Sequence, residues 1–366
     1  MRALVVGGTG PTGPYIVNGL LERGFEVAIF HRGTHEIDEI PPAVEHIHGD
    51  PHFLDTITGA LDGRTFDLAV VTYGRIRLLA EALRGKVGRF ISIGGVAAYR
   101  GYLEPERLRP AGMTSPIAED AALVDDETEH RFSWLIGQTE RAVFEHHPDA
   151  AHFRYPYVYG PRQLVPREWS VVRRLRDGRR HIIVADGGLS LLTHGFAGNL
   201  AHSVLLAADQ ADASAGQIYN CGDDEQYTTA QLIEVIARKM GSDVELVNLP
   251  HELARSAHIF GDGTTTHHRL MDTQKIRTEL GYRDMCSVPD ALGITVDWLL
   301  DNAPPAGGDV EQRLQDRFDY AAEDRLIAAW REAAASVAAI PIAERAERAH
   351  PYAHPKKPGE RDHRNR

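Results

Sequence analysis

A glycine-rich turn near the amino terminus constrains the fold of this chain more than any other feature. Residues 3–13 read ALVVGGTGPTG, in which an apolar stretch leads into Gly7, Gly10 and Gly13 and then into a helical stretch. This GxxGxxG spacing is related to the GxGxxG fingerprint of dinucleotide-binding proteins. The first glycine permits a tight turn, the second lets the main chain approach a pyrophosphate, and the third lets the helix pack closely. The turn therefore predicts a strand, a phosphate-binding loop, and a helix whose amino terminus faces the phosphates.

Apolar stretches alternate with helical stretches along the first half of the chain. This alternation predicts an α/β fold with a Rossmann-type, doubly wound parallel sheet and a smaller C-terminal substrate lobe. Further strands are expected at 25–30, 44–48, 67–72, 88–93 and 151–154. The expected domains are an NAD(P)-binding domain over 1–165 that can recruit segments from 190–220, a mainly substrate-binding lobe over 166–303, and a helix with a polar tail over 304–366.

Composition narrows the class of protein. The formal net charge of -12 argues against nucleic acid and anionic membranes as partners. No apolar run is long enough to span a bilayer. The two cysteines, Cys221 and Cys286, offer neither a disulfide framework nor a CxxC metal spacing. We therefore expect a cytoplasmic protein that acts on or binds a small molecule.

Residues that follow the first strands are the expected cofactor contacts. His31 and Arg32 end the second strand, where an acidic residue suits the ribose 2′-hydroxyl of NAD and an arginine suits the 2′-phosphate of NADP. The sequence therefore favours NADP over NAD, with a solvent-facing Arg32 as the alternative. The expected cofactor-binding residues are Gly7, Thr9, Gly10, Pro11, Thr12, Gly13, Arg32, Asp50, Tyr73 and Tyr155.

The stretch containing His46, His48, Asp50 and His52 superficially imitates a metal-binding motif. Its first residues belong to a predicted strand, whose side chains point alternately to opposite faces, and Pro51 interrupts the pattern. We therefore expect no metal site there.

Five longer motifs follow one another along the chain. They are GGTGPTG at 7–13, RFISIGG at 89–95, RYPYVYGPR at 154–162, GQIYNCGD at 216–223 and DTQKIRTELGY at 272–282. In sequence and order they resemble the extended short-chain dehydrogenase/reductase family, the NAD-dependent epimerases and dehydratases. The resemblance covers roughly residues 1–300 and implies a nicotinamide cofactor, an oxidoreductase or epimerase-like activity, and a homodimer.

The resemblance also implies a Ser/Thr, Tyr and Lys proton relay, and this relay is missing. Gly94 and Gly95 stand at the serine positions, Phe132 at the tyrosine and Ile136 at the lysine. No lysine occurs over residues 87–238, so the loss of the lysine does not depend on the alignment. The resemblance therefore implies an atypical member in which the cofactor site is kept and the usual relay is lost.

Any surviving acid or base must come from elsewhere. Tyr99 follows the fifth strand, Tyr155 follows the sixth, and His194 lies in the predicted substrate lobe, so these three are the candidate catalytic residues. For each of them a packing role is the alternative. The leading hypothesis is an NADP-preferring oxidoreductase or epimerase-like enzyme, and the second is a non-catalytic dinucleotide-binding sensor or interaction protein. The acidic charge argues against a third, RNA binding.

The substrate lobe departs from the pattern typical of sugar-nucleotide enzymes. Residues 191–200, LLTHGFAGNL, carry no arginine where that pattern places one for a diphosphate. We therefore expect a less charged carbonyl or hydroxyl compound as substrate. The nearby arginines are interpreted as a solvated helix face, with a cation for a diphosphate as the alternative; they are Arg162, Arg167, Arg173, Arg174, Arg179 and Arg180.

Overall fold

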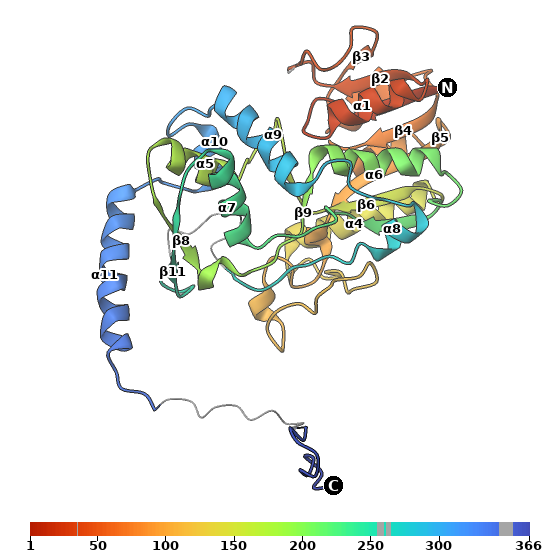
Figure 1. The fold of residues 1–366 in the computed structure, drawn as a ribbon. Helices are drawn as coiled ribbons and strands as arrows, with labels where there is room; N and C mark the ends of the chain where they lie inside the picture. The colour runs from red at the N-terminus through yellow and green to blue at the C-terminus, as the bar shows by residue number, and fades with distance from the viewer. Residues whose placement is uncertain (35, 255–259, 261–264, 344–353) are drawn as a thin grey trace. The chain divides into compact units, whose positions relative to one another are not determined.

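The computed structural model describes residues 1–34, 36–254, 260, 265–343 and 354–366, so residues 344–353 of the predicted polar tail lie outside it. Its main element is a seven-stranded sheet in the order β10-β6-β5-β4-β1-β2-β3 (Figure 1). All neighbouring strands in this sheet are parallel, which confirms the predicted Rossmann-type fold. The strands are β1 (Arg2–Val6), β2 (Glu26–His31), β3 (Glu45–His48), β4 (Phe66–Val71), β5 (Val87–Gly95), β6 (Ala151–Tyr155) and β10 (Gln217–Asn220).

Helices cover both faces of the sheet, as right-handed crossovers between parallel strands require. One face is covered by α1 (Gly13–Glu22) and α6 (Ala197–Asp209). The opposite face is covered by α2 (Leu54–Ala60), α3 (Ile76–Ala82) and α4 (Arg131–His146). The layers place the glycine turn and the carboxyl ends of the strands at one edge of the sheet, where ligands of such folds bind.

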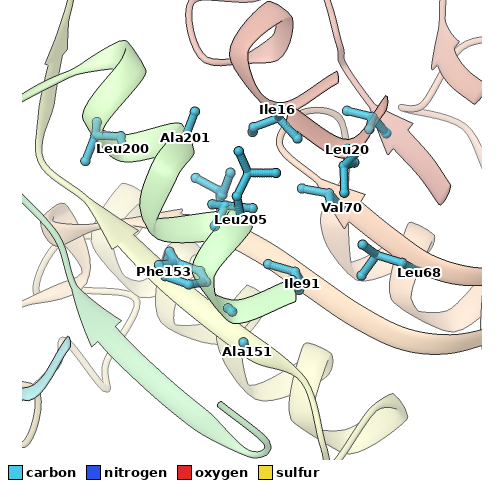
Figure 2. Packing of buried hydrophobic residues seen from close by; sticks show 14 of the residues in the cluster. Ile16, Leu20, Leu68, Val70, Ile91, Ala151, Phe153, Leu200, Ala201 and Leu205 are labelled. Atoms are coloured by element: carbon cyan, nitrogen blue, oxygen red, sulfur yellow. The ribbon is translucent and has the colours of Figure 1, made fainter. Parts of the chain in front are cut away.

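The core on the α1 and α6 face is closely packed (Figure 2). Val70 and Ile91 of the sheet share one buried cluster with Ile16 of α1 and Leu205 of α6. A Cβ on Gly19 would lie 2.3 Å from Cδ1 of Leu205, so α1 and α6 approach this closely only because residue 19 is glycine. Each fully buried side chain of this size contributes about 1.5–3 kcal/mol to the stability of the sheet.

A second apolar core lies in the C-terminal half of the chain. Trp169 is fully buried there against residues of three helices and a two-stranded sheet. The elements are α5 (Trp169–Arg176), α7 (Thr229–Lys239), α9 (Val288–Asp301) and the parallel pair β8 (His181–Ala185) and β11 (Glu245–Leu249). A second short pair, β7 (Tyr157–Tyr159) and β9 (His194–Phe196), follows β6 and precedes α6. After β9 the chain returns to the large sheet with α6 and β10. The expected domain limits at 165 and 303 stay a prediction.

The chain divides into two compact units, residues 1–319 and residues 320–366. The first also contains α8 (Gln274–Glu279) and α10 (Asp309–Leu314), and the second contains α11 (Tyr320–Ala338). Among the described helices, α11 included, we find none long and apolar enough to cross a membrane.

Two of the arginines expected on a solvated face instead form ion pairs within the fold, Arg174 fully buried and Arg173 partly buried. The Arg174 guanidinium, 2 % exposed, donates to both carboxylate oxygens of Asp316 at 2.6 Å and 3.1 Å. Arg173 on the same helix pairs with Glu311 of α10. The interpretation as a solvated face was therefore wrong for these two residues, because they hold the segment that follows the Pro-Gly linker.

Candidate functional site

The glycine turn joins β1 to α1 in a conformation that depends on its glycines. Gly7 and Gly8 have φ values of +109° and +56°, which glycine adopts without the steric cost of a Cβ. A Cβ on Gly13 would lie 2.1 Å from the carbonyl oxygen of Gly8, so α1 begins directly against the turn. The amide of Gly7 donates to the carbonyl oxygen of Phe30 at 3.1 Å, and the Thr9 hydroxyl donates to that of Gly7 at 3.3 Å. These contacts tie the turn to the end of β2.

The rest of the turn forms an open cradle at the amino terminus of α1. A Cβ on Gly10 would meet no atom within 4 Å. Pro11 has no N–H, and within the described part of the chain the N–H of Thr12 has no hydrogen-bond acceptor. This N–H and the positive end of the helix dipole can bind a phosphate. The residues present therefore fit the pyrophosphate of a dinucleotide.

The residues expected at the adenosine end lie where β2, β3 and β4 end. Arg32 is exposed, and exposed Tyr73 meets His52 edge-on with ring centroids 5.1 Å apart. The Asp50 carboxylate accepts a hydrogen bond from the backbone N–H of His52 at 3.0 Å and contacts its ring nitrogen Nδ1 at 2.7 Å. The hydrogen bond from His52, with a smaller contribution from the Arg32 charge, holds the pKa of Asp50 below its usual range. This edge of the sheet therefore presents the positive charge of Arg32 near the carboxylate of Asp50, which can accept hydrogen bonds.

The positions at which the sequence analysis places the proton relay lie at the end of β5 and on the first two turns of α4. Phe132 is 58 % exposed there. Gly95 is extended, with φ of −150°, and a Cβ on it would meet a single backbone oxygen at 3.8 Å. A Cβ on Gly94, by contrast, would lie 2.5 Å from Nε2 of His152. Position 95 thus has room for a side chain, and position 94 does not.

The first candidate acid, Tyr99, is fully buried. Its hydroxyl donates to Oδ1 of Asn220 at 2.7 Å and accepts from Nη1 of Arg154 at 2.6 Å. Burial raises the pKa of Tyr99 to about 12, although the Arg154 charge acts in the opposite direction. This arrangement favours the packing alternative over proton transfer to a substrate.

The other two candidates are also buried. The Tyr155 hydroxyl donates to the carbonyl oxygen of Leu200 at 3.0 Å, and burial raises the pKa of Tyr155 well above its ordinary value. His194 lines a cavity of about 10 Å³, which has room for no more than one water molecule. Burial, and then the charge of Arg167, lower the pKa of His194 to about 3. The structure therefore places neither side chain where a substrate can reach it.

A larger cavity, of about 340 Å³, contains residues that the sequence analysis missed. It is lined by the loop that follows Tyr99 and by His130 and Ser133 at the start of α4. Nδ1 of His130 accepts a hydrogen bond from the backbone N–H of Ser133 at 3.2 Å and lies 2.9 Å from its hydroxyl oxygen. The available signal was that these two residues flank Phe132, at the position of the missing tyrosine.

Comparisons with known proteins identify distant relatives, and no protein-family model matches the sequence. The chain is 26 % identical over 171 residues to the uncharacterized protein y4nL of Sinorhizobium fredii, covering 41 % of this chain and 47 % of that one. It is 28 % identical over 234 residues to dTDP-glucose 4,6-dehydratase of Streptomyces niveus, covering 62 % and 61 %. It is 25 % identical over 321 residues to the chloroplast stem-loop binding protein of 41 kDa b of Arabidopsis thaliana, covering 82 % and 79 %. The first two alignments therefore span 47 % and 61 % of the relatives' own lengths.

Solved structures share the fold over most of the chain at low sequence identity. UDP-glucose 4-epimerase of Thermotoga maritima, solved with UDP-glucose, has a TM-score of 0.65 at 16 % identity, covering 83 % of this chain and 100 % of that one. The enzyme WbmG of Bordetella bronchiseptica, solved with NAD, has a TM-score of 0.62 at 17 % identity, covering 82 % and 94 %. These structural similarities establish the fold. The relatives found by sequence include proteins named as a dehydratase and a putative epimerase. The chain therefore has the fold of NAD-dependent epimerases and dehydratases, and its sequence is similar to that of a dehydratase and of a putative epimerase.

Proposed function

We propose that this protein is an NAD(P)-dependent oxidoreductase or epimerase-like enzyme that acts on a small carbonyl or hydroxyl compound. The observation that carries the proposal is the cradle at α1, where position 10 is open and the N–H of Thr12 is free of other acceptors in the described chain. The sugar-nucleotide enzymes among the relatives support the reaction class. A cytoplasmic homodimer is part of the proposal.

The cofactor would lie across the carboxyl edge of the sheet, with its pyrophosphate at Thr12. A nicotinamide ring supplies a hydride acceptor and donor when bound. NAD is the cofactor named for the related fold of WbmG. We propose that this chain prefers NADP, because Arg32 offers a positive charge at the end of β2 where no carboxylate stands.

The proton relay would be displaced to the start of α4. Nδ1 of His130 is hydrogen-bonded to Ser133, so Nε2 is the ring atom that can exchange a proton with a substrate. Both residues line the 340 Å³ cavity, which is large enough for a small ligand. The exposed Phe132 between them would give the substrate an apolar contact in place of a phenol hydroxyl.

Binding of NADPH and NADH to the purified chain tests the cofactor site. Gly10→Ala adds a methyl group into open space, so the fold should be kept while the approach of the pyrophosphate is blocked. We expect at least a tenfold rise in the dissociation constant, which corresponds to about 1.4 kcal/mol. Gly59→Ala is the matched control, because a Cβ on Gly59 also meets nothing within 4 Å. Absence of NADPH and NADH binding to the unaltered chain would remove the basis of the proposal.

A non-catalytic dinucleotide-binding protein is the second candidate. The loss of the relay at Gly95, Phe132 and Ile136 favours it, as does the coverage of 82 % of this chain by the stem-loop binding relative. Oxidation of NADPH with any compound in a broad carbonyl panel decides for the enzyme. Binding of NADPH without turnover, together with salt-dependent retention on an RNA stem-loop, decides for the second candidate.

A further inference from the structure

Three histidines meet on one face of the sheet at its β3 edge. In the parallel pairing of β2 with β3, His31 is the register partner of His48, and Ile29 is the partner of His46. Residues two apart on a strand point to the same face, so His46 and His48 share the face of His31. Their ring centroids lie 5.0 Å and 5.1 Å from that of His31. Strand register therefore assembles a cluster of imidazoles that the linear sequence does not reveal.

The loop after β2 adds a carboxylate to this cluster. Oε1 of Glu36 lies 3.8 Å from Nδ1 of His46 and 3.7 Å from Nε2 of His48. Nε2 of His31 lies 3.1 Å from Nδ1 of His46. One ligand atom from each of the four residues falls within 4.8 Å of every other. In a tetrahedral zinc site with bonds of 2.0–2.1 Å, neighbouring ligand atoms are about 3.3 Å apart, so small side-chain shifts complete the geometry.

We propose that His31, Glu36, His46 and His48 bind one zinc ion. Three imidazoles and one carboxylate are donors that Zn²⁺ accepts in tetrahedral sites, whereas Ca²⁺ and Mg²⁺ require oxygen ligands. Four protein ligands leave no open position, so the ion is structural. The site differs from the stretch in which no metal was expected, because Asp50 and His52 contact each other and take no part.

The ion would fix the loop that carries Arg32. The N–H of Gly33 donates to Nδ1 of His31 at 3.3 Å. Ligation through Nε2 of His31 puts the ring proton on Nδ1 and breaks that bond, so the turn at Gly33 changes on loading. Gly33 already passes over His48, since a Cβ on it would lie 3.3 Å from that ring. Zinc therefore joins the ends of β2 and β3 through the intervening loop.

Titration of metal-free, tag-free full-length chain with zinc sulfate against a chelating dye tests the site. We expect sub-micromolar binding of one zinc ion at this site and a rise in the thermal unfolding temperature on loading. His48→Ala removes a ligand whose side chain is 57 % exposed, so the fold should survive while zinc affinity falls about a hundredfold or more. Cobalt in place of zinc should give the strong visible absorption of a tetrahedral ion.

His181→Ala is the matched control, because His181 also has a carboxylate partner, with Nε2 at 3.3 Å from Oε2 of Glu245, but belongs to no cluster of metal-binding groups found among the described residues. Zinc affinity that falls in His48→Ala and Glu36→Gln but not in the control supports the site. Equal zinc affinity in His48→Ala and the unaltered chain, or no binding at micromolar zinc, overturns it. These measurements need no cofactor or substrate, so their outcome does not depend on whether the proposed activity is correct.

Discussion

Arg154 donates a hydrogen bond from Nη1 to the hydroxyl oxygen of Tyr99 at 2.6 Å, and the guanidinium carbon lies 4.7 Å from the centre of the tyrosine ring. The same guanidinium forms a bidentate pair with the buried Glu140 carboxylate, at 2.7 Å and 2.9 Å. The phenol therefore belongs to an internal charged network between β6 and α4. In such a network the hydroxyl orders its neighbours, whereas a general acid must be free to meet a substrate.

Tyr99→Phe should destabilise the protein without changing cofactor affinity. The substitution leaves Oδ1 of Asn220 without the Tyr99 donor and removes one of the two acceptors of Nη1 of Arg154, which keeps the Glu119 carbonyl oxygen, at a cost of about 1–3 kcal/mol. Thermal unfolding and NADPH titration of the variant check this. A stable variant whose turnover drops a hundredfold would instead identify Tyr99 as the acid.

Gly95→Ser should leave stability almost unchanged, whereas Gly94→Ser should lower it. The extended backbone at 95 and the open space around it accept a serine, so we expect a change within about 0.5 kcal/mol. At 94 the new Cβ collides with the His152 ring and should cost several times more. Urea denaturation of the two variants in parallel measures the difference. Similar losses in both would show that the space at 95 is not available.

Arg32→Ala should weaken NADPH binding by roughly 10–100-fold and leave NADH binding almost unchanged, because the arginine would contact only the 2′-phosphate. Isothermal titration with both cofactors measures the ratio. Arg77→Ala, at an exposed position of α3, is the control for a general change in surface charge. Equal weakening of both cofactors would contradict the NADP preference.

His130→Gln should lower turnover by about 10²–10⁴-fold once a substrate is found, because it removes the proposed proton-exchanging nitrogen. NADPH affinity should not change, since His130 is not among the expected cofactor contacts and its side chain lines the 340 Å³ cavity. His181→Gln serves as the control. Full activity of His130→Gln would exclude the displaced relay.

Glu168→Gln should change how stability depends on pH. Burial raises the pKa of Glu168 to about 7, so the folded chain holds a proton that the unfolded chain releases between about pH 4.5 and 7. The free energy of unfolding therefore falls through this window as pH rises, by roughly 3 kcal/mol from this group. Relative to the unaltered chain, the variant should gain that amount between pH 5 and pH 8, as measured by urea denaturation. Glu145→Gln, on an exposed part of α4, should show no such gain.

The sequence predicted the parallel sheet because its strands are short apolar runs and its first turn needs glycine at fixed positions. Those signals are local, since Gly13 meets Gly8 only five residues away. The ion pair of Arg174 with Asp316 spans 142 positions, and the arginine alone looked like a surface residue. Ion pairs between residues so far apart in the sequence cannot be predicted from composition, because they depend on how separate elements pack.

The candidate site was less predictable for a related reason. Tyr99 and His194 were selected by position along the chain, whereas burial and neighbouring charges decide what they can do. His130 and Ser133 carried no motif, and their cavity exists only after the loop following Tyr99 has folded over α4. Likewise, the register of β2 with β3 brings His31 to His48.

The open space at Gly95 has a consequence for engineering. The extended backbone there accepts a serine side chain, and no side chain of the described residues lies within 4 Å of an added Cβ. A hydroxyl can therefore be introduced at this position without repacking. The same holds for a tyrosine at the exposed position of Phe132. A lysine at Ile136, by contrast, would place a charged group on a half-buried helix position.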